Sequence, residues 1–444
     1  MVRSLLMLVA LGSIVQTSLA EEKLTREQKV RLDKKLVEEK GFWIYNNLEE
    51  AYKRAEKSGK PVLVALRCIP CEECVKLDDE LVDTDPVIRP LLEQFECVRV
   101  ISTNGLDLDT FQFDTDQSWA VFMLNADKTI YGRYGTRSHR SDWSNDVSLG
   151  GLADALRGAL ELHKNFPANS STLAGKRGEP LEFASPERYP SHRDRYADRI
   201  DYTGTNVVQS CIHCHQIGDA RREYYWHDAK PIPEQLLFPY PHPTSIGMVL
   251  DPTRRATVKE VTPESPAAAA GLKSGDKITA MNGQPLLSIA DAQWVLHHTP
   301  ASEATVSLSV VRGDESTDLE LKLSEGWRRN DDISWRVASW QMRRIATGGM
   351  ILVPVSDERR EELGITEGMA LEATHVGQYN EHAAAKRAGF QKGDVITSYD
   401  GQSDLMREAD VFVYVNENKR PGDSMNVEVR RGDQRTQLNL PVQK

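Results

Sequence analysis

The chain has 444 residues and a formal net charge of -11, with an isoelectric point near 5.6. By length alone we expect about three domains. Hydrophobic residues make up 40 % and charged residues 27 %, the proportions of an ordinary soluble protein. The acidic balance argues against nucleic acid as the main partner.

The N-terminus has the pattern of a secretory signal peptide. A positive start at Arg3 is followed by an apolar run from Leu5 to Val15 and by the small residues Ser18 and Ala20. We expect cleavage after Ala20. The apolar run is too short to span a bilayer, so no transmembrane anchor is expected. These features predict an exported protein, in the periplasm or outside the cell, where disulfides and covalent haem persist.

Residues 41–165 alternate helix and strand patterns after a charged helical lead-in at 21–40. Short β-branched and aromatic runs predict strands, and amphipathic runs predict helices. The expected strands are 62–66, 95–100, 120–124 and 129–134, and the expected helices are 48–58, 72–81 and 150–163. Cysteines follow the first strand directly. The order strand, cysteines, helix, strand and hairpin is the ground plan of a thioredoxin fold.

Three cysteines, Cys68, Cys71 and Cys74, stand just after the first strand. The region resembles thioredoxin-like proteins whose first strand opens Lys-Pro-Val-Leu-Val, here residues 60–64. That resemblance implies that Cys71 is the nucleophile, that Cys74 resolves it and that Cys68 assists. A helix N-terminus stabilises a thiolate, and the i, i+3 spacing puts two sulfurs on one helix face. Other interpretations are a Cys68–Cys71 pair, a structural disulfide and a three-thiolate metal site.

Two neighbouring features modify this expectation. Glu72 and Glu73 between the cysteines disfavour a thiolate, which makes the couple more reducing than a strongly oxidising homologue. The cis-proline that thioredoxins carry opposite their cysteines is replaced here by Trp119 and Ala120. Cys97 falls within an expected strand, where it would be a small buried hydrophobe.

The stretch Cys211-Ile212-His213-Cys214-His215 has the attachment pattern of a c-type haem. The two thiols would bond the vinyl groups of one porphyrin edge, and His215 would be the proximal iron ligand. The distal ligand is open among His227, His242 and Met248. A zinc site or a Cys211–Cys214 disulfide is the alternative. The surrounding proline-rich residues 166–244 are interpreted as a linker whose short helices and turns pack on the haem.

Residues 270–283 (Ala-Gly-Leu-Lys-Ser-Gly-Asp-Lys-Ile-Thr-Ala-Met-Asn-Gly) recur in related form at 388–401, an offset of 388 − 270 = 118. The repeat resembles PDZ domains of the HtrA type. The resemblance implies a carboxylate-binding loop at Ile246, Gly247 and Met248, and a second at Gly349 and Met350. Backbone N–H groups there would hold a peptide C-terminus. The sequence contains no Gly-x-Ser-x-Gly nucleophile motif, so proteolysis is not expected.

The whole order resembles a family of exported, planctomycete-type bacterial proteins with thioredoxin-like and PDZ domains, some with selenocysteine at the redox site. The expected fold class is therefore multidomain α/β and β. The expected domains are a signal peptide (1–20), a lead-in (21–40), a thioredoxin-like domain (41–165), a short helical and irregular haem segment (166–244), PDZ 1 (245–325), a linker (326–347) and PDZ 2 (348–444).

These features predict an exported thiol–disulfide redox protein that carries haem c for electron transfer. Its PDZ domains would recruit a peptide or protein partner, and a second protein would exchange electrons with it. The alternative from a different class is a PDZ scaffold or sensor whose cysteines are structural.

Overall fold

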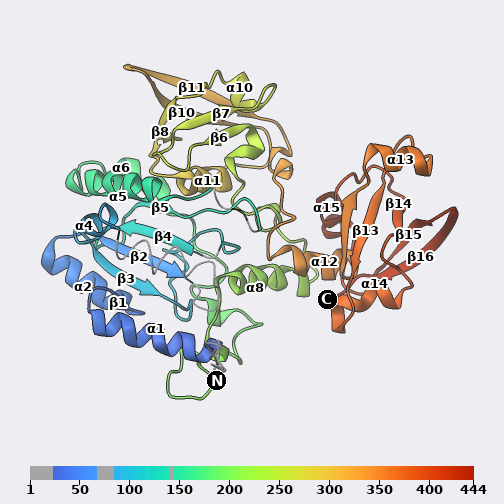
Figure 1. Ribbon diagram of the computed structural model, residues 1–444, viewed down its shortest axis with the longest axis horizontal. Helices are drawn as coiled ribbons and strands as arrows, with labels where there is room; N and C mark the ends of the chain where they lie inside the picture. The colour runs from blue at the N-terminus through green and yellow to red at the C-terminus, as the bar shows by residue number, and fades with distance from the viewer. Residues whose placement is uncertain (1–23, 68–84, 118, 141, 143–144) are drawn as a thin grey trace, which may run out of the picture.

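A computed structural model describes residues 24–67, 85–117, 119–140, 142 and 145–444. The signal peptide and the segment with Cys68, Cys71 and Cys74 lie outside the described residues, as does the helix expected at 72–81. Figure 1 shows three bodies: a blue and cyan domain, a yellow domain next to it, and an orange-red domain at the far end of the molecule.

The first domain is built on a five-stranded sheet with the order β1-β3-β2-β4-β5. Strands β2 and β3 are parallel, whereas β4 is antiparallel to both β2 and β5. The strands are β1 (Ile44–Tyr45), β2 (Val62–Arg67), β3 (Glu96–Val100), β4 (Trp119–Leu124) and β5 (Ile130–Tyr134). The helices are α1 (Arg26–Lys40), α2 (Leu48–Ser58), α4 (Ile88–Leu92) and α5 (Leu149–Lys164). This is the thioredoxin-like arrangement expected from the sequence.

Successive side chains of β2 point to opposite faces of the sheet, so the core of this domain has two layers. Leu63 and Ala65 share a buried cluster with α5, and Val62 and Val64 share another with α2. Every residue of β2 is buried. The strand is therefore covered on both faces, as a continuous apolar run predicts.

Residues 166–244 are not a loose linker, which corrects the interpretation made from their proline content. Tyr189 and the helix residues Ile217 and Ala220 belong to the same buried cluster as Val64 and Phe122 of the sheet. The elements are α6 (Ser170–Leu173), η2 (Ala174–Lys176), η3 (Pro186–Arg188), α7 (Val207–Ser210), α8 (Cys214–His227), α9 (Glu234–Leu237) and η4 (Pro243–Ile246). The part around Tyr189 and α8 thus packs on the thioredoxin-like sheet, whereas Leu236 and Leu237 of α9 share a buried cluster with the second PDZ domain.

The two repeated modules each form a PDZ domain. The first contains β6 (Met248–Leu250), β7 (Val258–Val261), α10 (Pro266–Ala269), β8 (Lys277–Met281), β9 (Gln284–Pro285), α11 (Ile289–His298), β10 (Ala304–Arg312) and β11 (Glu315–Leu323). The second contains β12 (Met350–Pro354), α13 (Asp357–Leu363), β13 (Leu371–Val376), η6 (Asn380–Ala383), α14 (Ala384–Arg387), β14 (Val395–Tyr399), α15 (Glu408–Asn418), β15 (Ser424–Arg431) and β16 (Gln434–Pro441). Helices α11 and α15 occupy equivalent places in the repeat.

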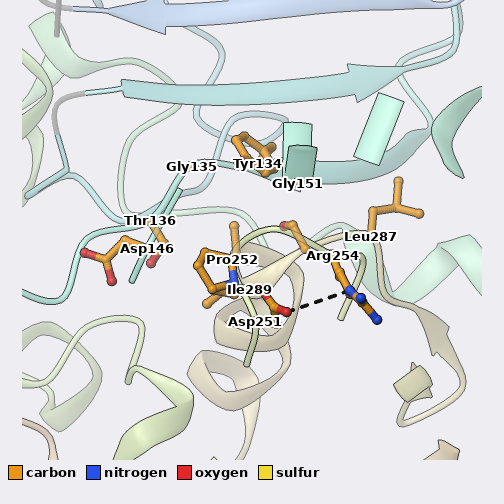
Figure 2. Close-up of a pocket in the computed structure, with 12 residues that line it drawn as sticks. Tyr134, Gly135, Thr136, Asp146, Gly151, Asp251, Pro252, Arg254, Leu287 and Ile289 are labelled. Atoms are coloured by element: carbon orange, nitrogen blue, oxygen red, sulfur yellow. Dashed lines mark ion pairs between the residues drawn. The ribbon is translucent and has the colours of Figure 1, made fainter. Parts of the chain in front are cut away.

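The first PDZ domain packs directly on the thioredoxin-like domain (Figure 2). The Ser148 hydroxyl donates to the carbonyl of Pro252 at 2.7 Å, and the Ser288 hydroxyl donates to the carbonyl of Arg133 at 2.5 Å. Gly151 permits the close approach, since a Cβ there would lie 2.2 Å from the Pro252 carbonyl oxygen. These contacts fix the start of α11 against β5.

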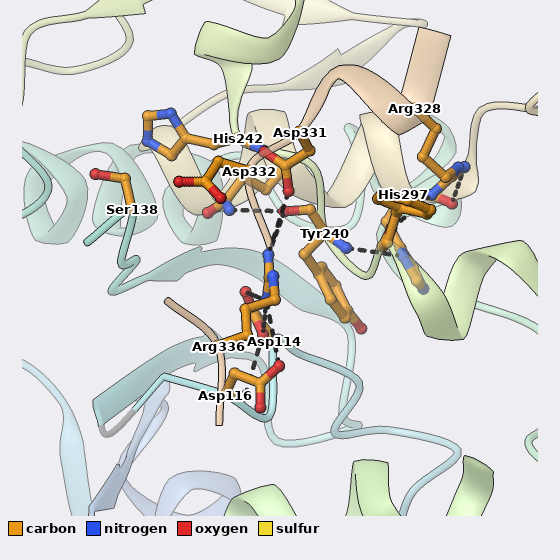
Figure 3. Close-up of polar contacts among 12 residues, drawn as sticks. Asp114, Asp116, Ser138, Tyr240, His242, His297, Arg328, Asp331, Asp332 and Arg336 are labelled. Atoms are coloured by element: carbon orange, nitrogen blue, oxygen red, sulfur yellow. Dashed lines mark hydrogen bonds and ion pairs between the residues drawn. The ribbon is translucent and has the colours of Figure 1, made fainter. Parts of the chain in front are cut away.

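The expected linker 326–347 is also an ordered, buried element, with η5 (Trp327–Asn330) and α12 (Ser339–Thr347). Arg336 donates to both carboxylate oxygens of Asp114, at 2.8 and 2.7 Å, and the backbone N–H of Ala338 donates to Asp116 at 3.0 Å (Figure 3). Trp327 is buried in the core of the first PDZ domain. This segment therefore holds the second PDZ domain to the first domain.

Candidate functional site

The Cys211–His215 segment lies at the edge of the sheet where β2 and β3 end. The two strands are parallel with Leu66 opposite Val100, so their carboxyl ends share one edge. Beyond β3, the Thr103 N–H and hydroxyl both donate to the carbonyl of Ile212, at 3.0 and 2.9 Å. Asn104 accepts from the Ile212 N–H at 2.8 Å. The Cys211–His215 segment is thus fixed beside the ends of β2 and β3.

Helix α1 holds this edge from outside the sheet. Arg67, the last residue before the cysteine segment, pairs with Asp33 at 2.5 Å, and both side chains are buried. The Tyr45 hydroxyl donates to the other oxygen of Asp33 at 2.8 Å. Burial, reinforced by the Asp33 charge, raises the pKa of Tyr45. The hydroxyl therefore stays protonated and acts as a donor at neutral pH.

The same helix also holds the chain that leads into Cys211. Glu27 accepts from the N–H groups of Val207 and Val208 at 2.9 and 2.7 Å, which caps α7. Arg31 donates to the carbonyls of Tyr202 and Gly204 at 2.9 and 2.5 Å. The charged lead-in helix was assigned no role from the sequence, because helical charge spacing gives no sign of a partner 170 or more residues away.

Within this segment, the second cysteine begins a helix. Cys214 is the first residue of α8, so His215 lies in its first turn. The Nδ1 of His215 is 3.4 Å from Asp219 Oδ2, and the imidazole side chain is 41 % exposed. Cys211 is buried, with its Sγ 3.4 Å from the Val207 carbonyl oxygen. Burial, with His215 and Arg26 nearby, lowers the pKa of His213 to about 4.

Two thiols and an imidazole are the residue types that a covalent haem requires, but only part of this set is accessible. Asp219 faces Nδ1 of His215, which leaves Nε2 on the opposite side of the ring, the arrangement that orients a metal-binding imidazole. An open cleft of about 500 Å³ is lined by Asn104, which holds the segment by its Ile212 N–H, but residues 211–215 are not among its lining residues. Tyr45, Leu48, Leu106 and Tyr202 also line it. Cys214 and His215 are the accessible members of the motif, whereas the sulfur of Cys211 is enclosed.

The three distal-ligand candidates lie away from His215. His227 is at the far end of α8, twelve residues on, which is about 18 Å along a helix. His242 is buried beside Asp146 and Thr244. Met248 is buried in the core of the first PDZ domain. In the described part of the chain, no group of three or more His, Cys, Asp or Glu side chains is arranged to hold a metal ion.

The first PDZ loop has the close-packed glycine that its motif requires. Gly247 has a φ of +78°, and a Cβ there would lie 2.1 Å from Ser265 Oγ. Ile246 and Met248 on either side are buried. In the second domain, Gly349 has a φ of +90° and Met350 begins β12. In each PDZ domain the loop therefore stands at the start of the first strand, which is the place that the sequence predicts.

A serine, a histidine and an aspartate meet between the first domain and the first PDZ domain. The Ser138 hydroxyl donates to Asp146 at 2.6 Å, while His242 Nε2 is 3.8 Å from the same carboxylate oxygen. In a catalytic triad the imidazole lies between hydroxyl and carboxylate, so that it can take the hydroxyl proton. Here the carboxylate lies between them. The cluster is thus a buried polar contact of the domain interface.

Comparison with known proteins assigns the same modules. A thioredoxin-like family model matches residues 43–126, and a PDZ-domain model matches residues 244–323 and 351–442. The chain therefore combines a thioredoxin-like domain with two PDZ domains. Among the described residues, no helix is long and apolar enough to cross a membrane.

The curated relatives are periplasmic proteases. A protein of Pseudomonas fluorescens named a probable DegP-like periplasmic serine endoprotease is 28 % identical over 148 residues, 33 % of this chain and 30 % of that protein. The periplasmic pH-dependent serine endoprotease DegQ of Escherichia coli is 33 % identical over 147 residues, 33 % of this chain and 28 % of DegQ. The matches thus span less than a third of these relatives.

Solved structures of two proteases, one of them of the HtrA type, also match in part. The protease AlgW with a bound tripeptide is 18 % identical with a TM-score of 0.20, over 32 % of this chain and 54 % of that one. The serine endoprotease from Yersinia pestis is 27 % identical with a TM-score of 0.14, over 16 % of this chain and 25 % of that one.

Proposed function

We propose that this is an exported redox protein whose thioredoxin-like domain carries out thiol–disulfide exchange beside a c-type haem segment, while its PDZ domains recruit a protein partner. The observation that supports it is the shared edge described above: Thr103 and Asn104 fix Ile212 of the haem motif beside the ends of β2 and β3. The periplasmic relatives and the signal-peptide pattern favour export.

Each turnover of the thiol chemistry uses two cysteines and transfers one electron pair to the substrate. The Cys71 thiolate would attack a disulfide of the substrate and release one substrate thiolate. The Cys74 thiolate would then attack Cys71 sulfur and release the second substrate thiol. The substrate gains two electrons, and a Cys71–Cys74 disulfide forms, which a redox partner must reduce again.

The haem would supply a one-electron carrier at the same edge. Cys211 and Cys214 would attach it and His215 would hold its iron. Asp219 would accept a hydrogen bond from Nδ1–H of His215 and so orient the imidazole, and the capped α7 fixes the segment before Cys211. Asp219 also pairs with Arg222 at 2.7 Å. Burial alone would raise the pKa of Asp219, but the hydrogen bond to His215 and the charge of Arg222 together lower it.

Reduction of insulin disulfides by dithiothreitol, followed as turbidity, tests the thiol half. The wild type should accelerate precipitation, Cys71→Ser should abolish the acceleration, and Cys97→Ser should keep it. Cys97 is the matched control because it is buried in β3. Equal activity of wild type and Cys71→Ser would overturn the assignment of the nucleophile.

The second candidate is a scaffold that binds peptides and uses its cysteines only structurally. The observation that favours it is the extent of buried contact between the domains, such as the Arg336–Asp114 pair, which suits a rigid platform. A wild type with no disulfide reductase activity would support this candidate.

A further inference from the structure

The groove of the second PDZ domain lies between the outer edge of β12 and helix α15. Strand β12 lies at one end of the five-stranded sheet and pairs with β13, and the Leu352 N–H of β12 donates to Glu408 of α15. Glu408, Val411 and Val415 are three and four residues apart on α15, which places them on one face of the helix. A bound peptide would add a strand to that edge of β12.

Two N–H groups that such a peptide would use are already occupied within the chain. In the loop, the Gly349 N–H donates to the carbonyl of Arg343 at 2.9 Å and so caps α12. On the strand, the Leu352 N–H donates to Glu408 Oε1 at 2.9 Å instead of to a peptide carbonyl. The Arg343 carbonyl thus takes the place of the ligand carboxylate, and Glu408 takes the place of a backbone carbonyl of the ligand.

Helix α12 covers the groove with apolar side chains and one ion pair. Met342, Ile345 and Ala346 share a buried cluster with Leu352 of the strand and Val411 of α15. Arg343 donates to both oxygens of Glu408, through Nη2 at 2.7 Å and through Nε at 2.9 Å. The two side chains are only 4 % and 7 % exposed. Figure 1 places α12 where α8 meets this domain.

The first PDZ domain has no equivalent of this ion pair. The N-caps Ser288 and Arg407 of the two groove helices are 119 residues apart, so Glu408 corresponds to 408 − 119 = 289, which is the apolar Ile289. On a neighbouring face of α11, Tyr240 stacks on His297 with ring centroids 4.0 Å apart, and its carbonyl accepts from Gln293 at 2.9 Å. The Arg343–Glu408 ion pair is therefore specific to the second PDZ domain.

We propose that α12 is the resident ligand of the second PDZ domain and that a peptide C-terminus binds there only by displacing it. The Arg343–Glu408 pair is the latch: it holds α12 against α15 and keeps Glu408 on the Leu352 N–H. The proposal rests on the peptide-recruiting role of the PDZ domains. A partner would thus bind the second PDZ domain only when α12, which also contacts α8, is released from the groove.

Hydrogen exchange of the full chain, read by mass spectrometry with and without peptide, tests this. The probe is a pool of decapeptides with an apolar last residue and a free carboxylate, and the same pool amidated is the ligand control. In Arg343→Met/Glu408→Leu, apolar groups replace the ion pair and leave the Leu352 N–H without its acceptor. Residues 349–354 should then exchange about tenfold faster, and the free-carboxylate pool should protect them at lower concentration than in wild type.

The matched control is Arg359→Met/Glu362→Leu, which removes an exposed Arg–Glu pair from α13 of the same domain. It should behave as wild type. A second reading uses the wild type alone: at saturating pool concentration, residues 339–347 should lose protection as residues 350–354 gain it. This reading stands even if the latch variant does not fold.

The proposal would be overturned if the peptide pool protected residues 350–354 equally in the wild type and the latch variant while residues 339–347 lost no protection. The groove of the wild type would then already be open. Protection at residues 248–250 alone, in every variant, would also overturn it but would leave peptide recruitment by the first domain intact. No protection at either site would contradict the recruiting role itself.

Discussion

Lys176 and Asp291 form an ion pair across the boundary between the middle segment and the first PDZ domain. The distance from Nζ to Oδ1 is 2.9 Å, and each side chain is 1 % exposed. Asp291 also accepts from the backbone N–H groups of Arg133 and Leu287, at 3.2 and 3.0 Å. A single carboxylate at the start of α11 therefore joins three separate parts of the chain.

Removing one partner of this pair should destabilise the protein strongly. Lys176→Met leaves a buried carboxylate without its cation, which costs about 3–5 kcal/mol in the free energy of unfolding. Urea denaturation followed by tryptophan fluorescence measures it. Arg157→Met, which removes an exposed pair with Asp154, is the control and should change stability by less than about 1 kcal/mol. Equal effects of the two substitutions would contradict the role of the buried pair.

Glu182 should make stability depend on pH in acid. Burial alone would raise its pKa, but the hydrogen bond and charge of Arg221, with the Tyr189 hydroxyl, lower the pKa from 4.5 to about 2. A lowered folded-state pKa contributes stability that is present above pH 4.5 and is lost as pH falls toward 2. The urea midpoint of wild type should therefore approach that of Glu182→Gln over this range. A constant difference between them would contradict the prediction.

Ionisation of Asp331 should lower the stability of the protein as pH rises, the opposite of the effect of Glu182, and should do so at a higher pH. Burial raises its pKa from 3.8 to about 6, against the attraction of Arg336. A raised folded-state pKa contributes stability that is fully present below pH 3.8 and is lost as pH rises through about 6. Asp331→Asn should therefore gain stability relative to wild type between pH 4 and pH 7 (a window set by those two values). Urea midpoints measured across this window would refute the account if the difference did not change.

Glu27 should control the order of the segment that precedes Cys211. Glu27→Ala removes the acceptor for two N–H groups of α7, at a cost of about 1–2 kcal/mol for a lost helix cap. Exchange of residues 202–210 should accelerate about tenfold, with little change in β12. Lys35→Ala on the same helix, where the side chain is 69 % exposed, should leave exchange unaltered. Unchanged exchange in Glu27→Ala would show that α1 does not hold this segment.

Local patterns predicted the elements well. The helix expected at residues 48–58 is α2, and the run from Val62 became the central strand β2, because periodicity and β-branched residues act over a few neighbours. The PDZ repeat was visible because its glycines and aspartates are fixed by tight turns, such as Asp276 and Asp394, which pair with Arg312 and Arg431 in the two copies.

Long-range packing was not visible in the sequence. Proline content led residues 166–244 to be interpreted as a linker, yet Tyr189 and Ile217 are buried against the sheet. The same holds for Arg336, whose partners Asp114 and Asp116 are more than 200 residues away. A pairing over such a distance leaves no periodic signal in one sequence.

The central claim, that the Cys211–His215 segment is a covalent haem site beside the thioredoxin-like sheet, is tested most directly by the absorption spectrum of protein exported from cells with haem-maturation machinery. A denaturing gel stained for haem should accompany it. We predict a Soret band and a stained band at the mature mass for wild type. Both should persist in His227→Ala, at the exposed end of the same helix, and the stain should be lost in Cys211→Ser/Cys214→Ser. A colourless, unstained wild-type protein from those cells would contradict the claim.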